Sequence, residues 1–372
     1  MIVKPLLKQS HHVIVSDDGD ICIGEIPNVS QVIESPPNWV KDVLGKLDGK
    51  RTLPRIIKEL VHENVGASED DIYNFIGMLL EANLLQDNSY HSALLSNEEI
   101  ERYDRQLLQF GLIDRDKVHS YVYQERLKKS KVVVFGMGGW GTWCSLLLAQ
   151  AGIGCLRIID GDDVELSNVN RQVLYKAKDV GLQKVNAAQK SIKEFNHNVA
   201  VECIDEFATP DKAELERLIS DSTFIVLAWA ALGYYRQDTV EEIIHEIAKE
   251  KNIPIIELGG DPLEISIGPI YPNDGSHKPY SSHNDNERQR FYHQDHDVEK
   301  FQKARLKHSF ADGDREVNAW QSSPSLAAMA GMACDQIIKF ITKYDSATIC
   351  GKRIFISLNS FNKREEVVFY CE

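Results

Sequence analysis

A glycine-rich loop at the end of a short apolar run is the feature of this sequence with the clearest chemical potential. Val132–Phe135 leads directly into Gly136-Met-Gly-Gly-Trp-Gly141, and a helical pattern follows. Glycines there allow a tight turn, and they let backbone N–H groups approach a phosphate at the helix N-terminus. Asp160 ends the next apolar run, about 20 residues on, where a carboxylate can bind ribose hydroxyls. These features predict a nucleotide site, which a nicotinamide dehydrogenase would fit equally well.

Charged and amide side chains around this segment separate two kinds of nucleotide site. An NAD site needs no collection of cations. A triphosphate attacked at its α-phosphorus does need one, because its negative charge must be held in a fixed geometry. The set therefore favours adenylyl transfer. Its members outside the glycine loop are Arg105, Asp160, Asp162, Asn168, Arg171 and Lys184.

The elements that must position these residues alternate between β and α patterns. Helical patterns separate five apolar runs, and a long helical pattern at Ser323–Tyr344 precedes two further β-like runs. This order predicts an α/β fold with a parallel, doubly wound, Rossmann-like sheet. The predicted strands are Val132–Phe135, Leu156–Asp160, Val199–Ile204, Phe224–Ala228, Ile255–Leu258, Arg353–Leu358 and Glu366–Tyr370.

The first 90 residues predict a separate small domain. Two β-like runs, His12–Val15 and Ile21–Ile23, precede three helical patterns, the last of which begins at Ser68 with Asp71 in the capping-box position. Strands followed by three short helices predict a winged helix-turn-helix over residues 1–90. Residues 91–372 then form the adenylation domain, with a polar, flexible crossover loop at about residues 273–317.

Charge and composition limit which partners and which location are expected. A formal net charge of −14 argues against nucleic acid or an anionic membrane surface as a partner. The sequence has no apolar run of about 18 residues, so no membrane span is expected. Its seven cysteines are scattered without close pairs, which is typical of reduced thiols and predicts a cytoplasmic location.

The ordered motifs resemble the MoeB/ThiF-type adenylyltransferases of the ubiquitin-activating superfamily. The resemblance rests on RYxRQ, GxGGxG, DxDxVxxSNxxRQ and the spaced lysine, and it covers roughly residues 100–270. It implies that ATP is bound and that Arg105, Arg171 and Lys184 are catalytic, with Arg105 acting from the other subunit of a homodimer. The residues implied to contact the nucleotide are Gly136, Gly138, Gly139, Gly141, Asp160, Asp162, Asn168, Arg171 and Lys184.

The sequence departs from this family at its magnesium site. Ala230 stands where the family carries an aspartate that holds Mg²⁺, and alanine offers no oxygen ligand. Three outcomes stay open. Another carboxylate takes over (Asp160, Asp162 or Asp261), the use of the metal changes, or catalysis is lost.

Family cysteines are missing as well. The two Cys-x-x-Cys pairs that hold structural zinc are absent, so no zinc is expected. No cysteine lies between Cys203 and Cys334, so transfer through an enzyme thioester is not expected either. Five histidines in the polar segment are irregularly spaced, which favours a crossover loop over a metal site. They are His277, His283, His293, His296 and His308.

The segment Leu47–Ile57 resembles PqqD-like domains, which bind the leader part of ribosomally made precursor peptides. With the adenylating segment, it resembles the peptide-maturation members of the superfamily, such as those of microcin C and pantocin A synthesis. This implies a precursor peptide as partner, bound by the N-terminal domain. It also implies ATP-dependent activation of a carboxylate, expected to be a Glu side chain, followed by ring closure in antibiotic biosynthesis. A non-catalytic leader-binding scaffold and a sulfur-carrier adenylyltransferase stay open as alternatives.

Overall fold

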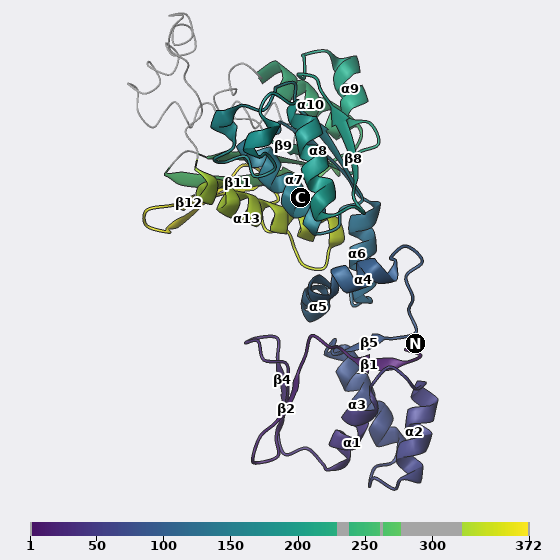
Figure 1. Ribbon diagram of the computed structural model, residues 1–372. Coiled ribbons are helices and arrows are strands. Elements are labelled where there is room, and N and C mark those ends of the chain that lie inside the picture. Colours follow the sequence, from purple (N-terminus) through teal and green to yellow (C-terminus); the bar gives the residue numbers. More distant parts are fainter. Residues whose placement is uncertain (1, 229–237, 261–262, 277–321, 371–372) are drawn as a thin grey trace, which may run out of the picture. The chain divides into compact units, whose positions relative to one another are not determined.

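The computed structural model describes residues 2–228, 238–260, 263–276 and 322–370 (Figure 1). The chain divides into two compact units. One is Met1–Arg126 with Thr342–Ser346, and the other is Leu127–Ile341 with Ala347–Glu372. The predicted domain boundary at residue 90 falls inside the first unit and stays a prediction.

Small sheets and three helices make up the N-terminal part of the first unit. Strands β2, β3 and β4 form one antiparallel sheet in that order, and β1 pairs antiparallel with β5. The small β/α domain predicted from the sequence is confirmed. Its elements are β1 (Pro5–Leu7), β2 (Val13–Val15), β3 (Ile21–Ile23), β4 (Gln31–Ile33), α1 (Trp39–Lys46), α2 (Leu53–His62), α3 (Glu69–Glu81) and β5 (Leu85–Asp87).

Amphipathic helices supply the apolar core of this domain, and a capping box fixes where one of them begins. Helix α2 buries Ile56, Ile57 and Leu60 in the domain core. Helix α3 begins with the predicted box, in which the Ser68 hydroxyl accepts from the Asp71 N–H and the Asp71 carboxylate accepts from the Ser68 N–H. Such a cap is worth about 1 kcal/mol.

Three helices follow β5 along the chain. They are α4 (Asn97–Arg102), α5 (Asp104–Ile113) and α6 (Ser120–Lys129). Helix α5 ends because Asp114 is left-handed, with φ of 38°. Its buried carboxylate accepts hydrogen bonds from Lys8 and from the Tyr123 hydroxyl, which tie the first strand of the chain to these helices.

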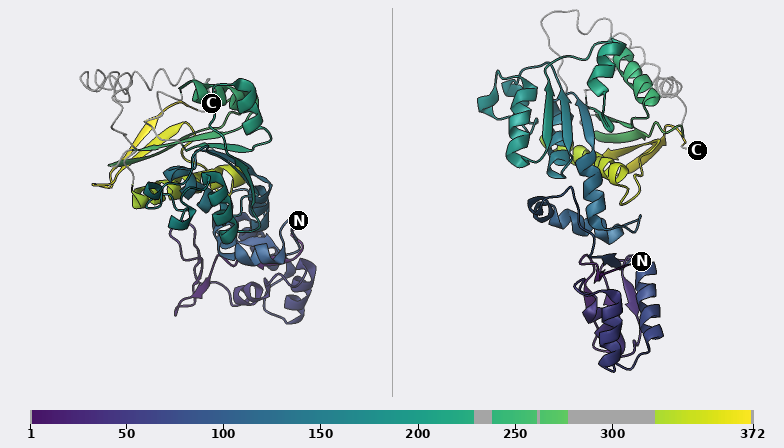
Figure 2. Two further views of the ribbon diagram at one scale, coloured as in Figure 1. Left: turned by 45° about the horizontal axis from the view of Figure 1, so that its top comes forward. Right: turned by 90° about the vertical axis from the view of Figure 1, so that its right-hand side faces the viewer.

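A mixed sheet of eight strands lies at the centre of the described part of the second unit (Figures 1 and 2). Its order is β13-β12-β11-β10-β9-β6-β7-β8. The five strands from β10 to β8 are parallel to one another, and β11, β12 and β13 add antiparallel. The predicted Rossmann-like α/β fold is therefore confirmed. The strands are β6 (Lys131–Phe135), β7 (Cys155–Ile159), β8 (Ala200–Ile204), β9 (Phe224–Leu227), β10 (Ile255–Gly260), β11 (Glu264–Tyr271), β12 (Lys352–Ser357) and β13 (Lys363–Val367).

Helices cover both faces of this sheet. On one face, α9 (Lys212–Ile219) and α10 (Asp238–Glu250) share a core with Phe135, Ile225 and Leu227. On the other, α7 (Gly139–Gln150) packs beside α8 (Lys184–Phe195), and α13 (Ser323–Thr342) places Phe340 against Phe224 with ring centroids 5.6 Å apart. Ile225 and Phe224 point to opposite faces because side chains alternate along a strand.

Strand β11 was not predicted from the sequence. Gly268-Pro269 stands in its middle, and glycine and proline in a strand normally weaken or interrupt it. Ala230, Asp261 and the five histidines of the predicted crossover loop lie outside the described residues. Within the described ranges, no helix is both long enough and apolar enough to cross a lipid bilayer.

Candidate functional site

The glycine loop turns sharply between β6 and α7. Gly136 has φ of 90°, a conformation that favours glycine, and its N–H donates to the Ile159 carbonyl at 2.9 Å. A Cβ on Gly141 would lie 1.8 Å from the Gly136 carbonyl oxygen. Gly141 therefore lets the first turn of α7 pack directly on the loop, and Gly138 and Gly139 line the cavity beside it.

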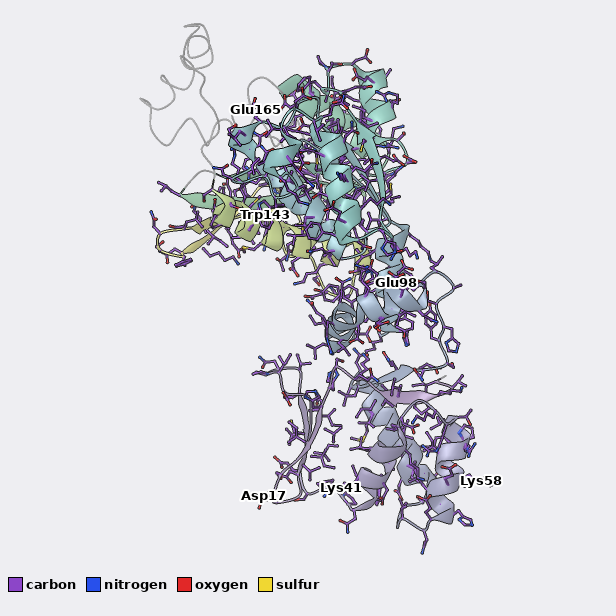
Figure 3. The ribbon with its side chains drawn as sticks, viewed as in Figure 1. Asp17, Lys41, Lys58, Glu98, Trp143 and Glu165 are labelled. Atoms are coloured by element: carbon purple, nitrogen blue, oxygen red, sulfur yellow. The ribbon has the colours of Figure 1, made fainter. Side chains whose placement is uncertain are left out.

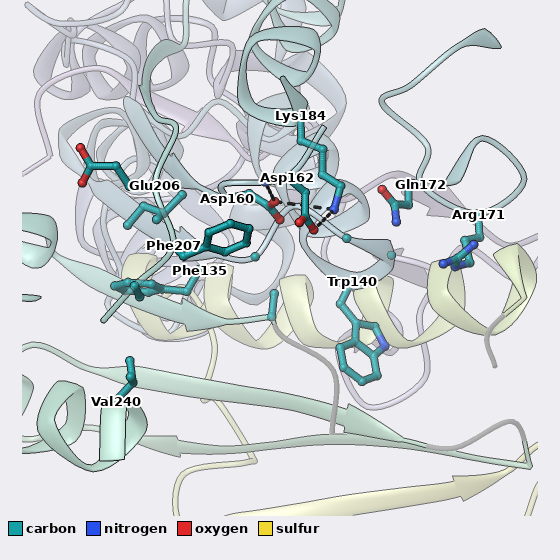
Figure 4. Close-up of a pocket in the computed structure, with 16 residues that line it drawn as sticks. Phe135, Trp140, Asp160, Asp162, Arg171, Gln172, Lys184, Glu206, Phe207 and Val240 are labelled. Carbon is teal, nitrogen blue, oxygen red and sulfur yellow. Dashed lines mark hydrogen bonds and ion pairs between the residues drawn. The ribbon is translucent and has the colours of Figure 1, made fainter. Parts of the chain in front are cut away.

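A cavity of about 280 Å³ opens at the carboxyl ends of the parallel strands, next to this loop (Figure 4). This is the edge at which open α/β sheets bind their ligands. Most of the residues predicted to contact a nucleotide line it, together with several that were not predicted. The lining comprises Phe135, Gly136, Gly138, Gly139, Trp140, Ile159, Asp160, Asp162, Arg171, Gln172, Lys184, Glu206, Phe207, Ala208, Ala228 and Val240.

Lys184 stands at the centre of the polar wall. Its Nζ lies 2.6 Å from Asp162 Oδ2 and 3.6 Å from Asp160 Oδ1, and the lysine side chain is only 8% exposed. Burial raises the pKa of the Asp160 carboxyl, while Lys184 and the backbone N–H groups of Asp162 and Met137 oppose that rise. Those N–H groups donate to Asp160 at 2.9 and 2.6 Å, so Asp160 also anchors the glycine loop to the end of β7.

Arg171 and Gln172 form one side of the pocket, and Phe207 lies on the other (Figure 4). The Arg171 backbone carbonyl accepts from Trp143 Nε1 at 3.1 Å, which fixes this turn to α7. The Gln172 side chain is buried, and its Oε1 has no hydrogen-bond partner among the described residues. A buried amide oxygen in a polar cavity is a group that a ligand can satisfy.

Gln172, Phe207 and Trp140 are lining residues that the sequence analysis did not assign to the nucleotide. Gln172 follows Arg171 directly in the DxDxVxxSNxxRQ motif. Its place in that motif could therefore have identified it as a residue of the pocket. Phe207 lies after β8, far along the chain, and it packs so closely on Gly161 that a Cβ there would lie 2.8 Å from the ring. No sequence spacing indicates that contact. Trp140 lines the cavity although its side chain is only 5% exposed.

Two predicted site residues of the second unit do not line the cavity. Gly141 packs closely against the Gly136 carbonyl and so supports the glycine loop. Asn168 is buried in a turn, where its Oδ1 accepts from the N–H of Glu165 (labelled in Figure 3) at 3.0 Å. Arg105 belongs to α5 of the first unit; its side chain is 90% exposed and lies 3.4 Å from the Asp104 carboxylate. The nucleotide roles of these residues stay predictions.

The arrangement suits a nucleoside phosphate. The N-terminus of α7 directs backbone N–H groups and the positive end of the helix dipole at the cavity. Lys184 and Arg171 add two cations, and Asp160 and Asp162 add carboxylates. Phosphate and ribose groups need this combination of donors, cations and acceptors.

Comparison with known proteins shows that the chain belongs to the ThiF family, whose sequence model matches residues 103–369. A second model, the N-terminal domain of PaaA-like proteins, matches residues 10–69. The resemblance inferred from the motifs is confirmed by these two matches.

Among solved structures, that of PaaA is 55% identical to this chain, with a TM-score of 0.80 over 98% of this chain and 100% of that one. The structure of Escherichia coli MccB with ATP has a TM-score of 0.71 at 21% identity, over 98% of this chain and 96% of that one, which supports the fold.

Curated relatives match over shorter segments. The molybdopterin-synthase adenylyltransferase of Escherichia coli (strain K12) is 37% identical over 134 residues, which are 36% of this chain and 50% of that protein. The HesA protein, vegetative, of Trichormus variabilis is 30% identical over 178 residues, which are 48% of this chain and 62% of that protein. The matches thus span less than two thirds of these relatives.

Proposed function

We propose that this protein uses ATP to activate a carboxylate of a ribosomally made precursor peptide, and that this carboxylate is a Glu side chain. One observation carries the proposal. A single cavity brings together the N-terminus of α7, Lys184, Arg171 and Asp160, in a chain of the ThiF family. The curated relatives named as adenylyltransferases support transfer of an adenylyl group.

In this proposal, a peptide carboxylate oxygen attacks the α-phosphorus of ATP. A new acyl–O–P bond forms, and the bond to the β-phosphate oxygen breaks and releases pyrophosphate. Lys184, Arg171 and the helix N-terminus hold the phosphate charge that redistributes in this step, and Asp160 binds the ribose. A backbone amide or carbon nucleophile of the same peptide then attacks the acyl carbon, closes a ring and expels AMP.

Mg²⁺ would neutralise phosphate charge during this step. Hard cations take oxygen ligands, and Ala230 supplies none. In the described part of the pocket, both Asp160 oxygens accept backbone N–H groups. The Asp162 side chain is 53% exposed, so its carboxylate is the more accessible oxygen donor. We assign the metal-holding role to Asp162.

The N-terminal domain supports a peptide as the partner. Its three-stranded sheet ends on one side at β2, whose Val13, Ile14 and Val15 are all exposed. An edge strand with exposed apolar side chains can accept an extended peptide as an additional strand. The solved structures of Escherichia coli MccB include complexes with the peptide MccA, and PaaA, similar along the whole length of this chain, carries the same kind of N-terminal domain.

The test incubates the protein with ATP and a candidate precursor peptide. Ring closure between a carboxylate and an amide or carbon nucleophile removes one water, which mass spectrometry of the peptide detects. The matched control replaces the candidate Glu of the peptide by Gln while keeping the leader unchanged. The proposal is overturned if the intact peptide binds but keeps its mass in the presence of ATP.

A non-catalytic scaffold is the second candidate, and Ala230 is the observation that favours it. A scaffold needs no phosphate cations. Replacing both Arg171 and Lys184 by Ala would then leave leader binding and modification by a partner enzyme unchanged. Loss of peptide modification with leader binding retained would exclude the scaffold.

A further inference from the structure

A cluster of ligand-type side chains lies between α10 and β10. Glu241 and His245 are four residues apart on α10 and so share a face of the helix, and Glu257 comes from β10. One oxygen or nitrogen of each lies within 4.8 Å of the other two. His245 Nε2 is 3.0 Å from Glu257 Oε1, and the histidine side chain is 1% exposed.

Arg353 orients the Glu257 carboxylate. Its Oε2 accepts from Arg353 Nη2 at 2.8 Å, and Arg353 Nε donates to the Gly268 carbonyl at 3.0 Å. Its other oxygen, Oε1, is fully buried and accepts no hydrogen bond from a described residue, although it is next to His245. Carboxylates that bind metals are usually hydrogen-bonded themselves, and Arg353 holds Glu257 in this way.

We propose that Glu241, His245 and Glu257 together bind a divalent transition-metal ion of the Zn²⁺ type. Imidazole nitrogen and carboxylate oxygen both bind zinc, and three protein ligands leave a fourth position for water. Magnesium takes oxygen ligands and does not favour imidazole, so this ion is distinct from the one that accompanies ATP. The missing Cys-x-x-Cys pairs led us to expect no zinc, and the proposed site uses different residues.

The site adjoins the nucleotide pocket in the fold. Val240, directly before Glu241, lines the pocket. Glu257 pairs with Leu227 of β9, and the next residue, Ala228, also lines the pocket. An ion bound here fastens the first turns of α10 to β10 and so stabilises one wall of the cavity.

The experiment titrates Zn²⁺ into chelator-treated full-length protein by calorimetry, without nucleotide, and follows thermal unfolding in parallel. We expect one ion per chain and a higher unfolding temperature, and Mg²⁺ should bind far more weakly. Glu241→Gln removes one ligand at a partly exposed position and should weaken Zn²⁺ binding at least tenfold. Glu246→Gln, an exposed neighbour on the same helix, is the matched control and should bind as the wild type does.

Two results would overturn the proposal. One is a wild-type protein that takes up no stoichiometric Zn²⁺, and this measurement needs no variant. The other is Zn²⁺ binding of equal strength in Glu241→Gln and Glu246→Gln, which would place the ion elsewhere. His245→Ala is less useful because loss of a buried ring can unfold the protein.

Discussion

Lys184 holds Asp162 by a 2.6 Å ion pair in the wall of the nucleotide pocket. The two residues lie at opposite ends of a long loop. A backbone hydrogen bond also joins them, since the Lys184 N–H donates to the Asp162 carbonyl at 3.0 Å. Asp163 and Gln183 form an isolated antiparallel bridge beside them. These contacts hold the two ends of the loop together. They therefore fix Lys184 and Arg171 relative to the glycine loop.

Lys184→Ala should lower peptide-stimulated nucleotide turnover by about 100-fold or more, because a buried cation in a phosphate site stabilises charge most strongly. Leader-peptide binding, measured by fluorescence anisotropy, should stay unchanged. Lys190→Ala, an exposed position on the same helix, is the control. Simultaneous loss of turnover and peptide binding would indicate misfolding or a different role.

Two glycine substitutions should separate folding from nucleotide binding. In Gly141→Ala the new methyl group meets the Gly136 carbonyl at 1.8 Å, so the unfolding temperature should fall clearly. In Gly138→Ala the nearest atom, Gln172 Nε2, is 4.0 Å away, so the fold should survive while phosphate approach is blocked. Thermal unfolding and ATP titration check both. Normal ATP affinity in Gly138→Ala would contradict the placement of phosphate at this loop.

Gln172→Met should keep or slightly raise the unfolding temperature, because it removes a buried amide oxygen that no described residue satisfies. It should weaken ATP binding about tenfold, since a hydrogen bond in a buried site contributes on the order of 1.5 kcal/mol. Calorimetric ATP titration measures this change. An unchanged affinity, with the fold intact, would remove Gln172 from the site.

The sequence predicted the parallel strands and most of the pocket, because both depend on local patterns. Apolar runs end where Gly136 and Asp160 must lie, and parallel strands bring those ends to one edge of the sheet. The antiparallel extension of the sheet through β11 was not predicted, because glycine and proline in the middle of this strand are unlike a strand sequence. Phe207 was missed because its contact with Gly161 is long-range, and long-range contacts leave no spacing in the sequence.

Acid should weaken the N-terminal domain partly through Asp87. Burial raises the pKa of this carboxyl, but the backbone N–H groups of Lys4, Val3 and Ser89 outweigh it and lower the pKa from 3.8 to about 2. A lowered folded-state pKa stabilises the protein above the unfolded value, and that contribution is lost as the pH falls from about 4 towards 2. Thermal unfolding of Asp87→Asn should depend less on pH in this window. Asp17→Asn, at an exposed position, should behave as the wild type does.

Arg105 tests the predicted homodimer. If it reaches the phosphates of the other subunit, Arg105→Ala and Lys184→Ala proteins should each be inactive, yet their mixture should regain part of the activity. In a mixed dimer, one of the two sites has both residues intact. The assay is peptide-dependent nucleotide turnover after subunit exchange, confirmed by native mass spectrometry. Verified mixed dimers without activity would rule out action across the subunit interface.

The most direct test of the central claim follows ATP labelled at the α-phosphate in the presence and absence of the precursor peptide. Adenylation predicts labelled AMP that appears only when the peptide is present, and far less of it with the Lys184→Ala protein. Labelled ADP in its place would keep carboxylate activation but move the attack to the γ-phosphate. A wild-type protein that binds the peptide and leaves ATP intact would contradict the claim.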